Sequence, residues 1–226
     1  MEKFNIAIDG PAGAGKSTIA RLVASALGFV YIDTGAMYRA VTWKIMDKGL
    51  QPDQTGDMIA LTKQMDIQLT PGEAGQNVFV DGYDVTGLIR TAEVTGYVSF
   101  VSSIAEIRQV LTRKQKEMAA SMGVVMDGRD IGSHVLPDAE VKVFLTASVL
   151  VRAERRLKEI EHTQPGITLE QLMHDIATRD RMDEQRDASP LVQAPDAILV
   201  DTTSMTIPEV VDRILELCAS RVGGGK

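Results

Sequence analysis

The sequence has a single cysteine, no long apolar segment and no excess of positive charge. Cys218 cannot form a disulfide within the chain, and no metal-ligand spacing surrounds it. An unpaired thiol suits a reducing compartment, and no apolar run approaches the roughly 20 residues that a membrane-spanning helix needs. We therefore expect a cytoplasmic protein in which Cys218 is a buried thiol of the amphipathic C-terminal segment.

The scarcity of positive charge restricts the partners that the protein can have. The chain has 24 Lys and Arg against 31 Asp and Glu, which gives a formal net charge of −7. This balance argues against nucleic acid and against an anionic membrane as partners, so any cluster of arginines needs a specific explanation. A length of 226 residues allows one sizeable core, and we expect a single domain and a monomer.

Five short apolar runs alternate with long segments of helical periodicity. The runs are 4–8, 29–32, 124–126, 141–145 and 197–200. Strands separated by helices are typical of a parallel sheet covered by helices, so the pattern predicts an α/β fold, a three-layer α/β/α sandwich. Its first helix ends at Gly28, and its last begins at the capping box of Thr206 and Glu209, with an apolar face that includes Ile207 and Ile214.

The character of the sequence changes between about residues 66 and 90. The turn signals Thr-Pro-Gly, Gly-Gln-Asn and Asp-Gly interrupt short apolar segments there. The stretch predicts a small antiparallel insert within the one domain, 1–226.

A phosphate-binding loop lies between the first predicted strand and the first predicted helix. It satisfies G-x-x-x-x-G-K-[ST] with Gly10, Pro11, Ala12, Gly13, Ala14, Gly15, Lys16, Ser17 and Thr18. Backbone N–H groups and the helix dipole would bind the phosphates of ATP, Lys16 would reach the β- and γ-phosphates, and Ser17 would offer its hydroxyl to Mg²⁺. The alternative is a glycine-rich turn that only connects strand and helix.

The loop alone does not distinguish kinases from GTPases or motor ATPases. The sequence has no Asn-Lys-x-Asp motif to read guanine. A small-molecule kinase is the class that remains, because ATPase machines need a longer chain and a partner site.

Three further motifs follow the loop: Asp33 to Arg39, Asp127 to Asp130, and Arg179 to Arg186. With them the chain resembles bacterial cytidylate kinase over essentially its whole length. The resemblance implies the P-loop NTPase fold, a nucleoside monophosphate (NMP)-binding region at about 66–90, and a short lid at about 152–168. It also implies phosphorylation of CMP and dCMP by ATP with Mg²⁺, by in-line transfer that needs no general base.

The resemblance assigns most of the substrate-binding residues. It implies that the CMP phosphate is clamped by Arg39, Arg129 and Arg186. The sugar would be bound by Arg179 and Asp183, and the base would be read by Ser99, Arg108 and Asp130. Thr34 would be a further substrate-binding residue. The alternatives remain a solvated arginine in each case, an ion pair between Arg179 and Asp183 within their helix, and a packing role for Ser99. Tyr38 is either near the acceptor or a core aromatic, and we interpret Asp180 and Arg181 as surface charges of the helix.

For catalysis, the resemblance implies charge neutralisation by the loop lysine and four arginines. These residues are Lys16, Arg129, Arg152, Arg156 and Arg186, with Arg155 binding ATP from the lid. Asp9, Asp33 and Asp127 each end or follow a predicted strand, so they should meet at the carboxyl edge of the sheet. Asp127 is the best candidate for contact with Mg²⁺, with Ser17. His134, His162 and His174 lack ligand spacing.

Two other functions remain open at this point. The protein could be a P-loop kinase for UMP, AMP or a non-nucleotide acceptor, or a nucleotide-dependent interaction protein that performs no transfer. An assay with a panel of acceptors distinguishes the other kinases from a CMP kinase. An interaction protein would show negligible turnover with any monophosphate.

Overall fold

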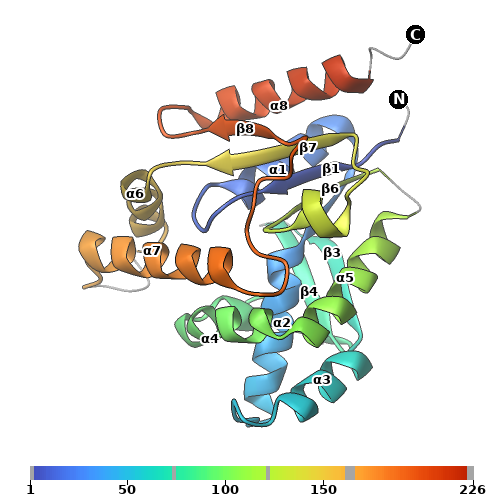
Figure 1. Ribbon diagram of the computed structural model, residues 1–226, viewed down its shortest axis with the longest axis vertical. Helices are drawn as coiled ribbons and strands as arrows, with labels where there is room; N and C mark the ends of the chain where they lie inside the picture. Colours follow the sequence, from blue (N-terminus) through green and yellow to red (C-terminus); the bar gives the residue numbers. More distant parts are fainter. Residues whose placement is uncertain (1–2, 73–74, 121–122, 161–165, 223–226) are drawn as a thin grey trace.

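A computed structural model of the chain describes residues 3–72, 75–120, 123–160 and 166–222. Within these residues the main sheet has five parallel strands in the order β2-β6-β1-β7-β8. The strands are β1 (Ile6–Asp9), β2 (Val30–Asp33), β6 (Val124–Gly128), β7 (Val141–Thr146) and β8 (Ile198–Asp201). Each strand overlaps one of the five predicted runs, with bounds that differ by up to two residues, and Figure 1 shows the sheet in the upper half of the molecule.

Eight α-helices cover and connect these strands in the part of the chain that the structure describes. They are α1 (Lys16–Leu27), α2 (Thr34–Asp47), α3 (Thr55–Gln64), α4 (Ala92–Ser103), α5 (Ala105–Ala119), α6 (Val149–Ile160), α7 (Leu169–Gln185) and α8 (Ile207–Val222). Helix α1 ends at Gly28, whose φ of 67° lies in the left-handed region that glycine adopts without strain.

Both faces of the main sheet are apolar, which requires a layer of helices on each side. Along β1, Ile6 and Ile8 belong to one buried cluster, together with residues of α1 and α8. Ala7 belongs to the opposite cluster, which is closed by α5 and by the π-helical turn Ile131–Val135. The predicted three-layer sandwich is therefore confirmed.

Helix α8 begins with the predicted capping box, because the Thr206 N–H donates to Glu209 Oε2 at 2.7 Å. Ile214 is fully buried against the sheet, and Cys218 lies in the same cluster, where burial raises the pKa of its thiol to about 11. The prediction was wrong for Ile207, which is 52% exposed. Ile207 is the first residue of the helix and lies at the wall of the cavity rather than over the sheet.

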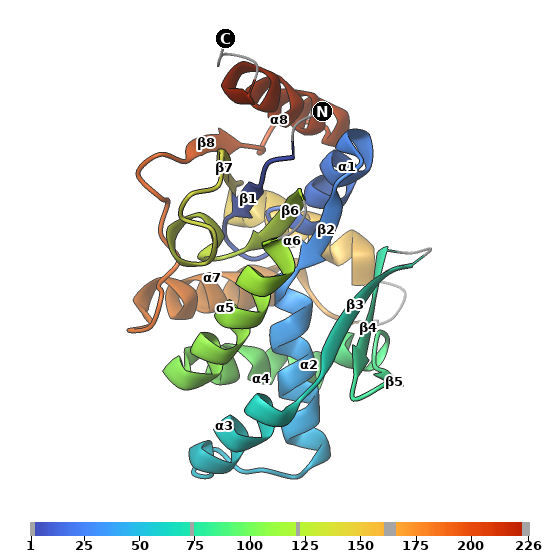
Figure 2. The ribbon, with the colours of Figure 1, turned by 90° about the vertical axis from the view of Figure 1, so that its right-hand side faces the viewer.

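The lower half of the molecule consists of α2, α3, α4, α5 and a second, antiparallel sheet (Figures 1 and 2). This sheet is formed by β3 (Ile67–Gly72), β4 (Gly75–Val80) and β5 (Tyr83–Asp84), and a 3₁₀ turn, η1 (Leu88–Arg90), follows it. Figure 2 shows the hairpin lying alongside α2, with which it shares an apolar cluster.

One side chain fixes this hairpin to the edge of the main sheet. Gln76 of β4 accepts from the Asp33 N–H at 2.9 Å and donates to the Tyr31 carbonyl at 2.6 Å. Its amide thus satisfies the free edge of β2 as a neighbouring strand would. The contact places the insert beside the carboxyl end of β2.

Helices α6 and α7 lie beyond the carboxyl ends of the strands (Figure 1). They pack on each other through a small apolar cluster that includes Ala153 and Ile176. Of the predicted lid, residues 161–165 with His162 lie outside the described residues, as does the segment 223–226. None of the described helices is long and apolar enough to cross a bilayer.

We predict that Ile214→Ala lowers the free energy of unfolding by about 2–5 kcal/mol, since it leaves a cavity between α8 and the sheet. Chemical denaturation measures this value. Ile207→Ala in the same helix is the control, with an expected cost below about 1 kcal/mol because the side chain is already half exposed. Equal costs for the two variants would contradict the packing described here.

Candidate active site

The loop between β1 and α1 follows a path that only glycine permits at its start. Gly10 has a φ of +146°, and a Cβ there would lie 2.0 Å from the carbonyl oxygen of Leu145 in β7. The loop therefore lies directly against the neighbouring strand. Its residues from Ala12 to Thr18 line one side of a cavity with a volume of about 1080 Å³.

Lys16 is almost completely buried at the first turn of α1. Its ammonium group donates to the carbonyl of Pro11 in the same loop at 2.7 Å. Burial lowers its pKa well below the ordinary value, and the nearby Arg129 acts in the same direction. A cation in this setting favours an anion in front of the loop.

Asp127, one of the last two residues of β6, is a buried carboxylate that binds the phosphate-binding loop. It accepts from the Ser17 hydroxyl at 2.8 Å and from the Tyr31 hydroxyl at 2.9 Å. Burial raises the pKa of Asp127 to about 7, and the charge of Asp33 across the strand pair adds to this effect. A cation beside Asp127 would offset the free-energy cost of burying its ionised carboxylate.

The pairing of Ser17 with Asp127 fits the Mg²⁺ site that the motif implies. Mg²⁺ is usually held by one or two protein oxygens together with phosphate oxygens and water. Among the described residues no group of three or more His, Cys, Asp or Glu could hold a metal by itself. The protein thus offers a partial set of oxygen ligands that a nucleotide phosphate would complete.

The wall opposite the loop is rich in arginine. Of the predicted site residues beyond the loop, those that line the cavity are Arg39, Ser99, Asp127, Arg129, Arg155, Arg156 and Arg179. Burial and mutual repulsion lower the pKa of Arg39 to about 9, with Arg179 as its strongest cationic neighbour. They lower the pKa of Arg179 to about 10, with Arg129 as its strongest cationic neighbour. The buried arginines thus repel one another, and an anionic ligand between them would reduce this repulsion.

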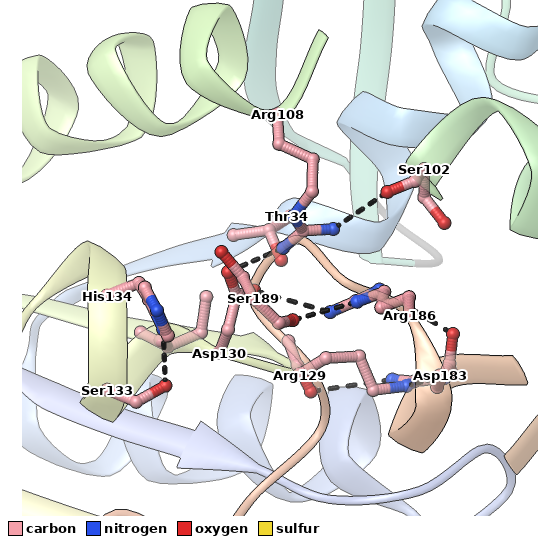
Figure 3. Close-up of polar contacts among 12 residues, drawn as sticks. Thr34, Ser102, Arg108, Arg129, Asp130, Ser133, His134, Asp183, Arg186 and Ser189 are labelled. Atoms are coloured by element: carbon pink, nitrogen blue, oxygen red, sulfur yellow. Dashed lines mark hydrogen bonds and ion pairs between the residues drawn. The ribbon is translucent and has the colours of Figure 1, made fainter. Parts of the chain in front are cut away.

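Behind this wall, the remaining predicted acceptor residues form one buried network (Figure 3). Arg108 pairs with Asp130 at 2.5 Å, and Arg186 lies 4.0 Å from the same carboxyl group. Asp183 continues the network, because it lies 3.6 Å from Arg186 and 2.8 Å from Arg129. Since Arg129 lines the cavity, the network begins at the cavity wall and extends inwards.

Several arginine donors of the network and of the cavity wall make no hydrogen bond within the part of the chain that the structure describes. Nε of Arg108, Nη2 of Arg186 and Nε of Arg179 are buried without a hydrogen-bond partner among the described residues. Buried donors without acceptors are costly, so such groups in a functional cavity are candidates for ligand contacts.

The alternative of an ion pair between Arg179 and Asp183 within α7 is not observed. Asp183 pairs with Arg129 and Arg186 instead, and Arg179 makes no ion pair with any residue that the structure describes. Although burial acts to raise it, Arg129 and Arg179 hold the pKa of Asp183 below its ordinary value. The guanidinium of Arg179 is therefore not committed to its own helix.

The three predicted lid arginines have different surroundings. Arg155 donates to the Thr202 carbonyl at 2.7 Å, and Arg156 pairs with Glu159 at the surface at 3.0 Å. Both line the cavity, but Arg152 does not. Its side chain is 5% exposed and bound to protein groups, so the expectation that Arg152 closes over ATP with the lid is corrected.

Asp180 is a second correction, because we interpreted it as a surface charge. Its side chain is 11% exposed, and it pairs with Arg152 at 2.7 Å. The spacing within one helix could not reveal a partner on another helix. Arg181, in contrast, is exposed as expected.

The other predicted residues occupy structural positions around the site. Thr34 donates to the Asp127 carbonyl at 2.7 Å, and Asp9 accepts from two N–H groups of the turn that follows Asp130. Tyr38 is buried, with the guanidinium carbon of Arg108 5.2 Å from its ring centroid. It is thus both a core aromatic and a neighbour of the acceptor network.

Sequence reasoning missed two residues that the structure brings to the site. Tyr31 binds Asp127 through its hydroxyl. Arg90, at the end of the insert, lines the cavity and lies 3.4 Å from Asp33. Arg90 could have been considered as a cation at the end of the predicted insert, whereas nothing in the β2 sequence singles out the Tyr31 hydroxyl.

The parallel sheet and the loop between β1 and α1 define a P-loop protein of the α/β class. The shikimate kinase structure from Bacteroides thetaiotaomicron aligns with a TM-score of 0.50 at 18% identity, covering 96% of this chain and 99% of that one. A gluconokinase from Sinorhizobium meliloti 1021 aligns with a TM-score of 0.50 at 17% identity, covering 98% and 97%. At these identities the likeness supports the fold alone.

The chain belongs to the cytidylate kinase family, whose model matches residues 6–220. It is 54% identical to the cytidylate kinase of Exiguobacterium sibiricum over 217 residues, which is 96% of this chain and 97% of that protein. It is 51% identical to the cytidylate kinase of Geobacillus sp. (strain WCH70), with 97% and 98% covered. The predicted resemblance is thus confirmed, and the protein is a kinase.

We predict that Gly10→Ala reduces nucleotide affinity at least tenfold, because the added methyl group displaces the loop from β7. Titration with a fluorescent ATP analogue measures this affinity. Gly28→Ala is the control: its φ is also positive, but no atom lies within 4 Å of the added Cβ. It should cost about 1–2 kcal/mol of stability and leave nucleotide affinity intact. Normal affinity in the Gly10 variant would contradict the role of this loop.

Proposed function

We propose that the protein transfers the γ-phosphoryl group of ATP to CMP and dCMP. The observation that carries this proposal is the buried network of arginine and aspartate behind the cationic cavity wall, opposite the phosphate-binding loop. A phosphorylated acceptor would place its phosphate at that wall and its base at the network. Family membership supports a nucleoside monophosphate as the acceptor.

The mechanism follows from the charge around the cavity. An acceptor phosphate oxygen is already anionic, so its attack on the γ-phosphorus needs no general base. Lys16, Arg129 and Arg156 would neutralise the charge of the transferring group, and Arg39 and Arg179 would hold the acceptor. Lys16 and Arg129 are already held by the Pro11 carbonyl and by Asp183, and cations oriented before the substrate arrives stabilise a transition state most effectively.

Mg²⁺ would be held by Ser17 and Asp127, and when bound it neutralises phosphate charge and orients the nucleotide. Tyr31 supports this role, because its hydroxyl fixes one oxygen of the Asp127 carboxylate. Arg155 would hold ATP from the side of β8, where it is anchored to Thr202.

The acceptor base would be read by Arg108 and Asp130, with Ser99 at the cavity wall. Cytosine presents a 4-amino donor beside its N3 and O2 acceptors, whereas uracil presents an O4 acceptor beside an N3–H donor. A carboxylate at position 4 and an arginine at N3 and O2 therefore both favour cytosine. The unpartnered Nε of Arg108 supports this assignment. Arg179 and Asp183, which lie one turn apart on α7 and form no ion pair with each other, would bind the sugar.

An assay of ADP release with CMP, dCMP, UMP, AMP and GMP tests the proposal. We expect kcat/KM for CMP and dCMP to exceed that for the other acceptors by at least about tenfold, because unmatched buried polar groups reject the wrong base. Lys16→Ala is the control for contaminating kinases and should lose about a hundredfold or more of kcat. Preferred turnover of UMP, AMP or GMP would contradict the proposal, and so would turnover of none.

We predict that Asp130→Ala lowers the ratio of kcat/KM for CMP to that for UMP by at least about tenfold, mainly through loss on CMP. Arg108→Met should have the same effect. Arg113→Met is the control, because Arg113 lies on the same helix with a 69% exposed side chain. Both monophosphates are assayed at saturating ATP and Mg²⁺, with thermal melts to confirm folding. An unchanged ratio in both folded variants would remove these residues from the base site.

A further inference from the structure

One residue of the phosphate-binding loop is held by side chains from two other helices. The Ala12 N–H donates to Asp180 Oδ1 at 3.2 Å, and the Ala12 carbonyl accepts from Arg152 Nη1 at 2.8 Å. Arg152 Nη1 also lies 2.7 Å from Asp180 Oδ2. The three contacts form a closed ring around the backbone of Ala12.

The two side chains of this ring are largely buried. The side chains of Arg152 and Asp180 are 5% and 11% exposed. Nε of Arg152 donates to the Ala147 carbonyl at 2.9 Å, so the guanidinium is anchored just before α6 as well. Hydrogen bonds to ionised groups are shorter and stronger than neutral ones, which makes this a stiff connection.

Stability alone does not explain such a pair. A buried ion pair often contributes little to folding, because removing two charges from water offsets their attraction, and apolar replacements are frequently tolerated. The pair comes from α6 and α7, which are 140 and 168 residues away from Ala12 in sequence. Its contacts to the N–H and the carbonyl of one loop residue point to the geometry of the loop.

We propose that Arg152 and Asp180 are positioning residues that hold the phosphate-binding loop in its ATP-receiving conformation. We call this pair the loop clamp. The inference rests on the proposed ATP-dependent activity, and neither residue touches the substrate. A loop that is already held in place does not have to be ordered when ATP binds. A flexible loop loses conformational entropy on binding, and this loss lowers its affinity for ATP.

The clamp also fixes the base of α6. Arg152 lies in the first turn of that helix, while Arg155 and Arg156 follow it and line the cavity. The anchored Arg152 is thus about one helical turn away from the two arginines that line the cavity. The loop and the cationic face of α6 therefore keep a fixed distance from each other.

Two variants test the clamp. Asp180→Asn keeps the shape but places an amide donor against the guanidinium, and the double variant Arg152→Met/Asp180→Leu replaces the pair with apolar side chains. We expect the dissociation constant of a non-hydrolysable ATP analogue and the KM for ATP to rise at least tenfold in both. The KM for CMP should change less than threefold, and the double variant should melt near the wild-type temperature.

Asp196→Asn is the matched control, because Asp196 forms an ion pair with Lys142 that is also 2.7 Å long but lies away from the cavity lining. It should leave ATP affinity unchanged. Arg152→Lys, which keeps the charge but cannot serve all three acceptors, should bind ATP with an affinity between those of the wild type and Asp180→Asn.

ATP affinity within twofold of wild type in folded Asp180→Asn would overturn the inference, and so would equal losses for ATP and CMP. If the double variant does not fold, the ATP affinities of Asp180→Asn and Arg152→Lys still test the inference. The binding measurement needs no acceptor, so a wrong assignment of CMP would appear only in the turnover assay and leave the test of the clamp intact.

Discussion

The pairing of buried arginines with three aspartates is the constraint on which the rest of the site depends. Asp130, Asp180 and Asp183 each accept at least one guanidinium, and they neutralise arginines that would otherwise be too costly to bury. Arg39 and Arg179 have no such partner among the described residues, and burial lowers the pKa of both. The paired arginines are thus fixed by the protein, and the two unpaired ones are the cations that we propose an anionic substrate to neutralise. An anionic substrate would bind more tightly because it reduces the repulsion between these two arginines. The charges that make the folded state costly would therefore contribute to substrate binding.

The sequence predicted the layers of the fold and the phosphate-binding loop because both follow from local patterns. Apolar runs bounded by turns locate the strands, and the glycines of the loop precede Lys16 at a fixed spacing. The environments of Arg152 and Asp180 could not be predicted in this way. Spacing along a helix tells which residues share a face, but not which other helix that face meets. Asp180 stands between two arginines in the sequence, and its actual partner lies on α6.

The position of the insert relative to the main sheet could not be predicted from sequence patterns either. Turn signals predicted its strands, but nothing in them indicates that Gln76 binds the backbone of β2. That contact brings η1, and with it Arg90, to the cavity wall. Asp33, which caps α2 and lies 3.4 Å from Arg90, connects the insert to the same strand end. The proposed acceptor side of the site is therefore assembled by contacts between segments that are distant in the chain.

Helix α7 connects the two sides of the cavity. Asp180 binds the phosphate-binding loop, whereas its neighbour Arg179 lines the cavity and the following Asp183 binds Arg129 of the proposed acceptor side. Successive residues of a helix differ in direction by about 100°, so one turn presents side chains to two different walls. The helix is stiff over this length and is tied at Asp180 to the backbone of Ala12. A movement of the acceptor groups of α7 must therefore be transmitted to the loop, unless the buried pair of Arg152 and Asp180 breaks.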